Sequence, residues 1–127
     1  MTDISISELL GKTLVDIAVI DINQALVFTL DDGTKYRMEH YQECCEGVTI
    51  EDITGNLADL IGAPILMAEE STGEDSPEGT VVADNARDYQ LWTFYRLATV
   101  KGYVTIRWFG EGNGYYSIAV GFSKEQA

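Results

Sequence analysis

Basic residues are scarce in this chain of 127 residues. Eight Lys and Arg stand against 21 Asp and Glu, which gives a formal net charge of -13. Nucleic-acid binding through the phosphates needs clustered Lys and Arg, so this balance argues against direct contact with DNA or RNA. It also argues against docking on an anionic membrane surface. Long apolar runs are missing too, and residues 1–3 do not begin like a secretory signal, so we expect a cytoplasmic protein with no membrane segment.

Cysteine and histidine are equally rare, with two residues and one. Cys44 and Cys45 are adjacent, and neighbouring cysteines rarely bond to each other because the ring would strain the peptide. We therefore expect two reduced thiols and no disulfide framework. The rest of the composition, 46% hydrophobic and 10% aromatic, is sufficient for the core of a single domain over residues 1–127.

Alternating apolar residues predict a hairpin in the first third, after a helical turn over 5–10 and an extended run over 13–20. A two-residue Asp-Gly turn is one alternative. A three-residue loop with Gly33 in the left-handed conformation is the one we favour, because it gives one coherent apolar face. In that register Leu26 lies opposite Met38 and Phe28 lies opposite Tyr36.

One helix is predicted over residues 49–61. Thr49 is suited to cap its start, and Gly62 and Pro64 to end it. The apolar residues that fall at helical spacing are Ile50, Ile53, Leu57, Leu60 and Ile61.

The last third is rich in aromatic and β-branched residues and predicts a three-stranded meander over 89–99, 103–109 and 115–122. A three-residue loop at its first turn would place Phe94 opposite Trp108. Residues 71–88 have the composition of a long acidic loop. The sequence therefore predicts an α+β fold, a curved antiparallel sheet of about seven strands with one main helix packed on one side.

Two stretches resemble a known family. The run from His40 to Val48, in which Cys44 and Cys45 precede Glu46, resembles the central motif of a small domain family of unknown function found in bacteriophages and bacteria. The run from Trp92 to Thr99 resembles that family's second motif. The resemblance covers nearly the whole chain and implies a phage origin, but it implies no activity and no catalytic residues.

Acidic residues are concentrated in the middle of the chain, where twelve carboxylates and no Lys or Arg lie between Met38 and Ala86. Such a negative field steers a basic partner. We hypothesise a phage-encoded, non-enzymatic protein that docks on a basic surface of a host protein, as an inhibitor of a nucleic-acid-handling or defence protein. A solvated, solubilising surface is the plainer alternative. The candidate partner-binding residues are Glu51, Asp52, Asp59, Glu69, Glu70, Glu74, Asp75 and Glu78.

A metal site is a second, weaker possibility, formed by His40, Cys44, Cys45 and Glu46. Zinc takes thiolate and imidazole ligands, but adjacent cysteines are not the usual chelate spacing. Packing cysteines and a partly buried, hydrogen-bonded histidine are the ordinary alternative. A cysteine nucleophile with His40 as its base is disfavoured by the acidic surroundings. We therefore lean away from an enzyme and expect no cofactor.

A nucleotide-sized ligand is the third possibility, because sheets that carry aromatic rings and Arg can stack bases and hold phosphates. The candidates are Trp92, Arg96 and Arg107. Alternatively, half of the rings face the core and the arginines pair with the chain's own carboxylates. The predicted register places Arg96 on the same core face as Trp92, where it would need an acidic partner or a bound anion.

Overall fold

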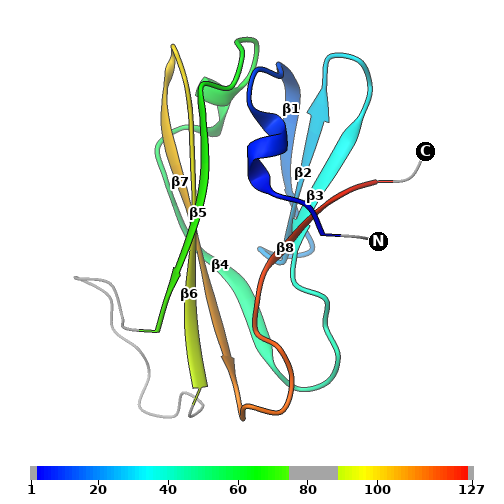
Figure 1. Cartoon of the computed structure of the whole chain (residues 1–127), viewed down its shortest axis with the longest axis vertical. Coiled ribbons are helices and arrows are strands. Elements are labelled where there is room, and N and C mark those ends of the chain that lie inside the picture. Colours follow the sequence, from blue (N-terminus) through cyan, green and yellow to red (C-terminus); the bar gives the residue numbers. More distant parts are fainter. Residues whose placement is uncertain (1–2, 75–88, 126–127) are drawn as a thin grey trace.

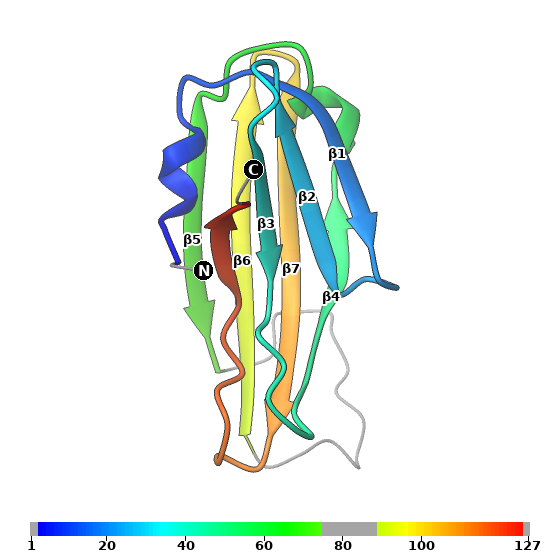
Figure 2. The ribbon, with the colours of Figure 1, turned by 90° about the vertical axis from the view of Figure 1, so that its right-hand side faces the viewer.

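Two four-stranded antiparallel sheets lie face to face in the computed structural model, which describes residues 3–74 and 89–125 (Figure 1). The first sheet has the order β1–β2–β3–β8, and the second has the order β4–β7–β6–β5. Figure 2 shows the first sheet in front of the second. The strands are β1 (Leu14–Ile20), β2 (Ala25–Leu30), β3 (Lys35–Glu39), β4 (Gly47–Thr54), β5 (Met67–Gly73), β6 (Tyr89–Thr99), β7 (Gly102–Gly112) and β8 (Gly121–Lys124).

The predicted α+β class is wrong, because the described residues contain no long helix. Residues 49–61 form most of β4 and then η2 (Leu57–Leu60), a 3-10 turn. A register shift between Ile50 and Asp52 in the pairing of β4 with β7 explains the misleading spacing. The irregularity returns Ile53 to the core-facing side, so a strand carries apolar residues three apart, as a helix would.

The first predicted hairpin is confirmed. Strands β2 and β3 pair with Leu26 opposite Met38 and Phe28 opposite Tyr36. Gly33 has φ 89°, the left-handed conformation that the three-residue loop required. The predicted helical turn near the start is the 3-10 helix η1 (Ile6–Leu9).

The predicted meander is wrong in its register and in its third strand. A two-residue turn joins β6 to β7, so that Thr99 pairs with Gly102 and Phe94 lies opposite Arg107 rather than Trp108. After β7 the chain crosses to the first sheet, where β8 pairs with β3. This crossing makes a sandwich rather than a single sheet, since both sheets then cover one core.

The core lies between the sheets, and Trp108 is at its centre. Its side chain is fully buried and its indole N–H donates to Sδ of Met38 on β3 at 3.3 Å. The largest buried side chains come from both sheets, which interdigitate as in other sandwiches. They include Trp108, Tyr95, Phe28, Phe122, Leu26, Met38, Leu97 and Ile106.

The turn between β1 and β2 holds a residue in an unfavourable conformation. Ile22 has φ 53° and is 91% exposed, although left-handed backbone is costly for a β-branched residue. Ile22→Asn is expected to stabilise the protein by about 1 kcal/mol, because Asn tolerates this conformation. Urea unfolding measures the change. The matched control is Val100→Asn in the exposed turn after β6, where φ is not positive. Equal effects of the two substitutions would contradict the prediction.

Candidate functional site

A cavity of about 460 Å³ opens on the outer face of the first sheet, at the end where β3 and β8 meet. We call it the acidic pocket, because three of its lining residues are Asp3, Glu39 and Glu43 and none is Lys or Arg. Pairing builds it, since Glu39 lies opposite Gly121 and Asp3 bridges to Ser123. Its size falls in the range of about 300–1,000 Å³ typical of ligand sites.

The wall of the pocket is a loop organised around Glu46. The Glu46 side chain is 2% exposed and the neighbouring His40 side chain is 4% exposed. One carboxylate oxygen, Oε2, accepts from His40 Nε2 at 2.7 Å and from the backbone N–H of Glu43 at 2.8 Å. The other, Oε1, accepts from the N–H of Cys44 at 3.0 Å. A single buried carboxylate therefore fixes the path of residues 43–46.

These donors stabilise the ionised form of Glu46. The backbone N–H of Glu43 is the largest cause and His40 adds to it, so that together they outweigh burial and lower the carboxyl pKa from 4.5 to about 2. Glu46 is therefore charged throughout the physiological range.

His40 joins the loop to the segment before β8. Its Nδ1 lies 2.7 Å from the carbonyl oxygen of Ala119, while Nε2 faces Glu46. Both of these oxygens can only accept, so each hydrogen bond needs a proton on the ring nitrogen that faces it. The expected partly buried, hydrogen-bonded histidine is confirmed. With both nitrogens bonded to oxygens, neither is oriented to bind a metal or to act as a base for a thiol.

Cys44 and Cys45 are bonded to each other, so the expectation of two reduced thiols is wrong. Both residues are exposed rather than packed in the core. The Gln42 side-chain amide donates to the carbonyl oxygens of Cys44 and Glu46, at 3.0 and 2.7 Å. These bonds order the chain around the disulfide. The described residues contain no group of three or more potential metal ligands.

The charge of the pocket is only partly neutralised within the molecule. Arg37 on β3 contacts Glu39 at 2.5 Å, Glu125 at 3.1 Å and Asp21 at 3.8 Å. Asp3 and Glu43 have no basic partner among the described residues. Their two carboxylates leave the pocket with negative charge.

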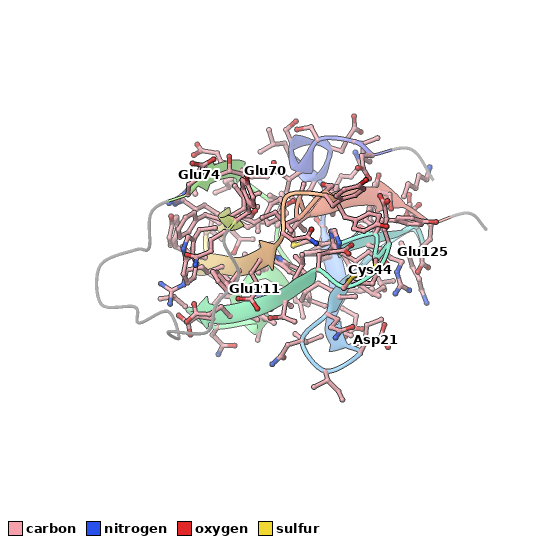
Figure 3. All side chains as sticks on the ribbon, turned by 90° about the horizontal axis from the view of Figure 1, so that it is seen from below. Asp21, Cys44, Glu70, Glu74, Glu111 and Glu125 are labelled. Atoms are coloured by element: carbon pink, nitrogen blue, oxygen red, sulfur yellow. A yellow bond between two sulfur atoms is a disulfide. The ribbon has the colours of Figure 1, made fainter. Side chains whose placement is uncertain are left out.

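The predicted partner-binding residues do not form one patch. Glu51 and Asp52 lie on β4 and pair with Arg107, whose pKa is raised mainly by Glu51. Strand β5, at the opposite edge of that sheet, carries Glu69 and Glu70. Figure 3 shows Glu70 and Glu74 on one side of the molecule and Asp21 and Glu125 on the other. Asp59 lies in η2, and Asp75 and Glu78 are outside the described residues.

Two of the three predicted ligand-binding residues, Trp92 and Arg107, meet on the outer face of the second sheet, whereas Arg96 contacts Phe94. The guanidinium of Arg107 lies 5.6 Å from the ring centroid of Trp92, and that of Arg96 lies 5.1 Å from that of Phe94. Arg96 donates to Oγ of Ser71 at 2.7 Å. The predicted core position of Arg96 is wrong, because the core-facing residues of β6 are its neighbours in sequence, such as Tyr95 and Leu97. Trp92 is 3% exposed, and its indole N–H has no partner among the described residues.

Sequence reasoning missed Asp3, Tyr41 and residues 117–123 as parts of one site. They meet only because β8 pairs with β3, a contact between segments more than 80 residues apart. A local signal did exist in the lone histidine followed six residues later by Glu46, since a buried imidazole needs a partner.

The chain belongs to DUF7448, a family defined as a domain of unknown function, which matches residues 7–122. No curated protein and no solved structure matches it. None of the helices in residues 3–74 and 89–125 has the length and hydropathy of a membrane span.

Proposed function

We propose that this protein is a non-enzymatic binding protein whose acidic pocket takes up a Lys or Arg side chain from a basic protein surface. The observation that carries the proposal is the pocket of Asp3, Glu39 and Glu43, whose lining contains no Lys or Arg. Carboxylates and a guanidinium form paired hydrogen bonds, so a hollow of this charge selects a cationic group.

The arrangement of its wall supports a binding role. Tyr41 is 82% exposed beside the carboxylates, and it offers an aromatic face to an incoming cation. The loop that carries Tyr41 and Glu43 is held by Glu46 before any ligand arrives. A preorganised wall lowers the entropy that binding must overcome.

The identity of the partner and the place where it is met are also proposals. The resemblance to proteins of bacteriophages suggests that the partner is a basic host protein, encountered in the host cytoplasm. A host protein that handles nucleic acid is a suitable partner, because its binding surface carries the opposite charge.

Binding of a labelled hexa-arginine peptide, followed by fluorescence anisotropy, tests the proposal. Affinity is expected to fall about tenfold between about 0.05 and 0.5 M salt, because exposed charges are screened over about 10 Å or less. A double Asp3→Asn, Glu43→Gln variant is expected to bind about tenfold more weakly at low salt.

The matched control is a double Asp16→Asn, Asp31→Asn variant, which also removes two negative charges. Asp16 lies on β1, at the edge of the first sheet opposite β8, and Asp31 lies in the turn between β2 and β3. It should retain nearly full affinity. Gly121→Ala changes no charge but directs a methyl group at the Asp3 carboxylate, within 2.6 Å, and it should weaken binding. Equal losses of affinity in the two double variants would mean that the peptide is attracted by the overall negative charge, which would contradict binding in the acidic pocket. Absence of binding at low salt would contradict it as well.

A further inference from the structure

The Cys44–Cys45 disulfide contributes little to the stability of the fold as a whole. A disulfide stabilises a fold mainly by closing a loop of the unfolded chain, and a bond between adjacent residues closes almost none. Both residues are exposed, so that a thiol in solution can reach the sulfurs. Exposed disulfides tend to be the labile ones that take part in exchange.

The same residues belong to the wall of the acidic pocket. The Cys44 N–H donates to Glu46, and its carbonyl oxygen accepts from Gln42. The preceding residue, Glu43, lines the pocket and donates its own N–H to the Glu46 carboxylate. A change in the ring formed by Cys44 and Cys45 therefore acts on backbone groups that hold Glu43 in place.

We propose that Cys44 and Cys45 form a redox-active site that exchanges with dithiol reductants and sets the affinity of the acidic pocket. The second part rests on the function proposed above; the first part does not. The oxidised ring holds the loop in the conformation seen here, and the reduced pair releases it.

The exchange balances as a two-electron reaction. A thiolate of the dithiol attacks Sγ of one cysteine, and the Sγ–Sγ bond breaks. The other cysteine leaves as a thiolate and takes up a proton. The second thiol of the reductant then attacks the mixed disulfide and releases the first cysteine, so that the reductant ends as its own disulfide.

The test equilibrates the folded protein with defined ratios of reduced and oxidised dithiothreitol. Samples are quenched in acid, alkylated and analysed by mass spectrometry, while circular dichroism monitors the fold. Two alkylated cysteines are expected to appear together in one transition, with an unchanged fold. A cysteine pair that stays reduced even in excess oxidised glutathione would overturn the redox site, and so would a disulfide that excess dithiothreitol reduces only when the protein unfolds.

The coupling to the pocket is measured with the hexa-arginine peptide on both redox forms. We expect the affinities to differ by about fivefold or more, the usual lower range for coupled sites. A Cys44→Ser, Cys45→Ser variant should bind equally in both buffers, which controls for effects of the buffer. Equal affinity of the two wild-type forms would overturn the coupling. Absence of binding in either form would reject the pocket function, while the alkylation result would still decide the redox site.

Discussion

A Glu46→Ala variant is expected to release the loop over residues 41–46 and to lower the affinity of the acidic pocket for a cationic peptide by about tenfold or more. The substitution removes the acceptor of three hydrogen bonds at once. It leaves the backbone N–H groups of Glu43 and Cys44 without that acceptor, and it leaves the buried ring of His40 unpaired on one side, which is costly for a buried donor. Peptide anisotropy measures the affinity, and amide hydrogen exchange at Glu43 and Cys44 measures the order of the loop.

The matched control for this variant is Glu69→Gln, which removes one negative charge from the exposed face of β5. It should leave both the exchange rates and the affinity close to those of the wild type. If Glu46→Ala bound the peptide as tightly as Glu69→Gln does, the loop would not be what shapes the pocket.

The same residue predicts a dependence of stability on pH. The pKa of Glu46 falls from 4.5 to about 2 on folding, so its ionised form stabilises the native state fully above pH 4.5. That contribution is lost as the pH falls from 4.5 toward 2, because the unfolded chain then binds the proton more readily. A Glu46→Gln variant has no such group. Its deficit in stability relative to the wild type should therefore shrink across this window, and a deficit that stays constant in urea unfolding would contradict the assigned pKa.

The second large effect is expected at Trp108. Trp108→Ala should lower the free energy of unfolding by about 3–5 kcal/mol, because it removes the largest fully buried side chain of the described residues and leaves a cavity between the two sheets. Domains of this size have total stabilities of about 5–15 kcal/mol, so the variant would be close to unfolding. Trp108→Phe should cost less, since a ring remains and only part of the volume and the contact with Sδ of Met38 are lost. Urea unfolding measures both.

Tyr103→Ala is the control for this prediction. Tyr103 lies on the same strand but on its outer side, and it is 51% exposed. Its removal should change stability by no more than about 0.5 kcal/mol. Similar costs at Trp108 and Tyr103 would contradict a core enclosed between β7 and the first sheet.

Local signals allowed part of the fold to be predicted. The hairpin of β2 and β3 followed from strict alternation and from one glycine, Gly33, whose left-handed conformation sets the register. The turn between β6 and β7 offered a similar glycine, but Gly102 pairs with Thr99 inside the ladder instead of occupying the turn. The number of residues in a turn determines the register, and the sequence left that number open.

The incorrect prediction of a helix over residues 49–61 has a physical reason. An irregularity in β4 gives Ile50 and Ile53 a spacing of three on the same side of a strand, which periodicity alone does not distinguish from one face of a helix. The β-branched residues Val48, Thr49 and Thr54 were the contrary signal, since such side chains favour strands.

The sequence predicted only those residues of the candidate site that lie close together in the chain. A stretch of seven residues contains His40, Cys44, Cys45 and Glu46, and these residue types alone indicate a possible metal site. The other half of the pocket depends on the pairing of Glu39 with Gly121, which no pattern within either segment specifies. The sequence does not predict the disulfide, because bonds between adjacent cysteines are rare.

The most direct test of the central claim is an NMR titration of the uniformly labelled protein with the hexa-arginine peptide at low salt. We expect the largest shifts at the amides of the pocket, in particular Tyr41, Glu43 and Gly121, and a response in the ring signals of His40. Shifts confined to Glu51 and Asp52 on β4, or to Glu69 and Glu70 on β5, would contradict an acidic pocket as the binding site.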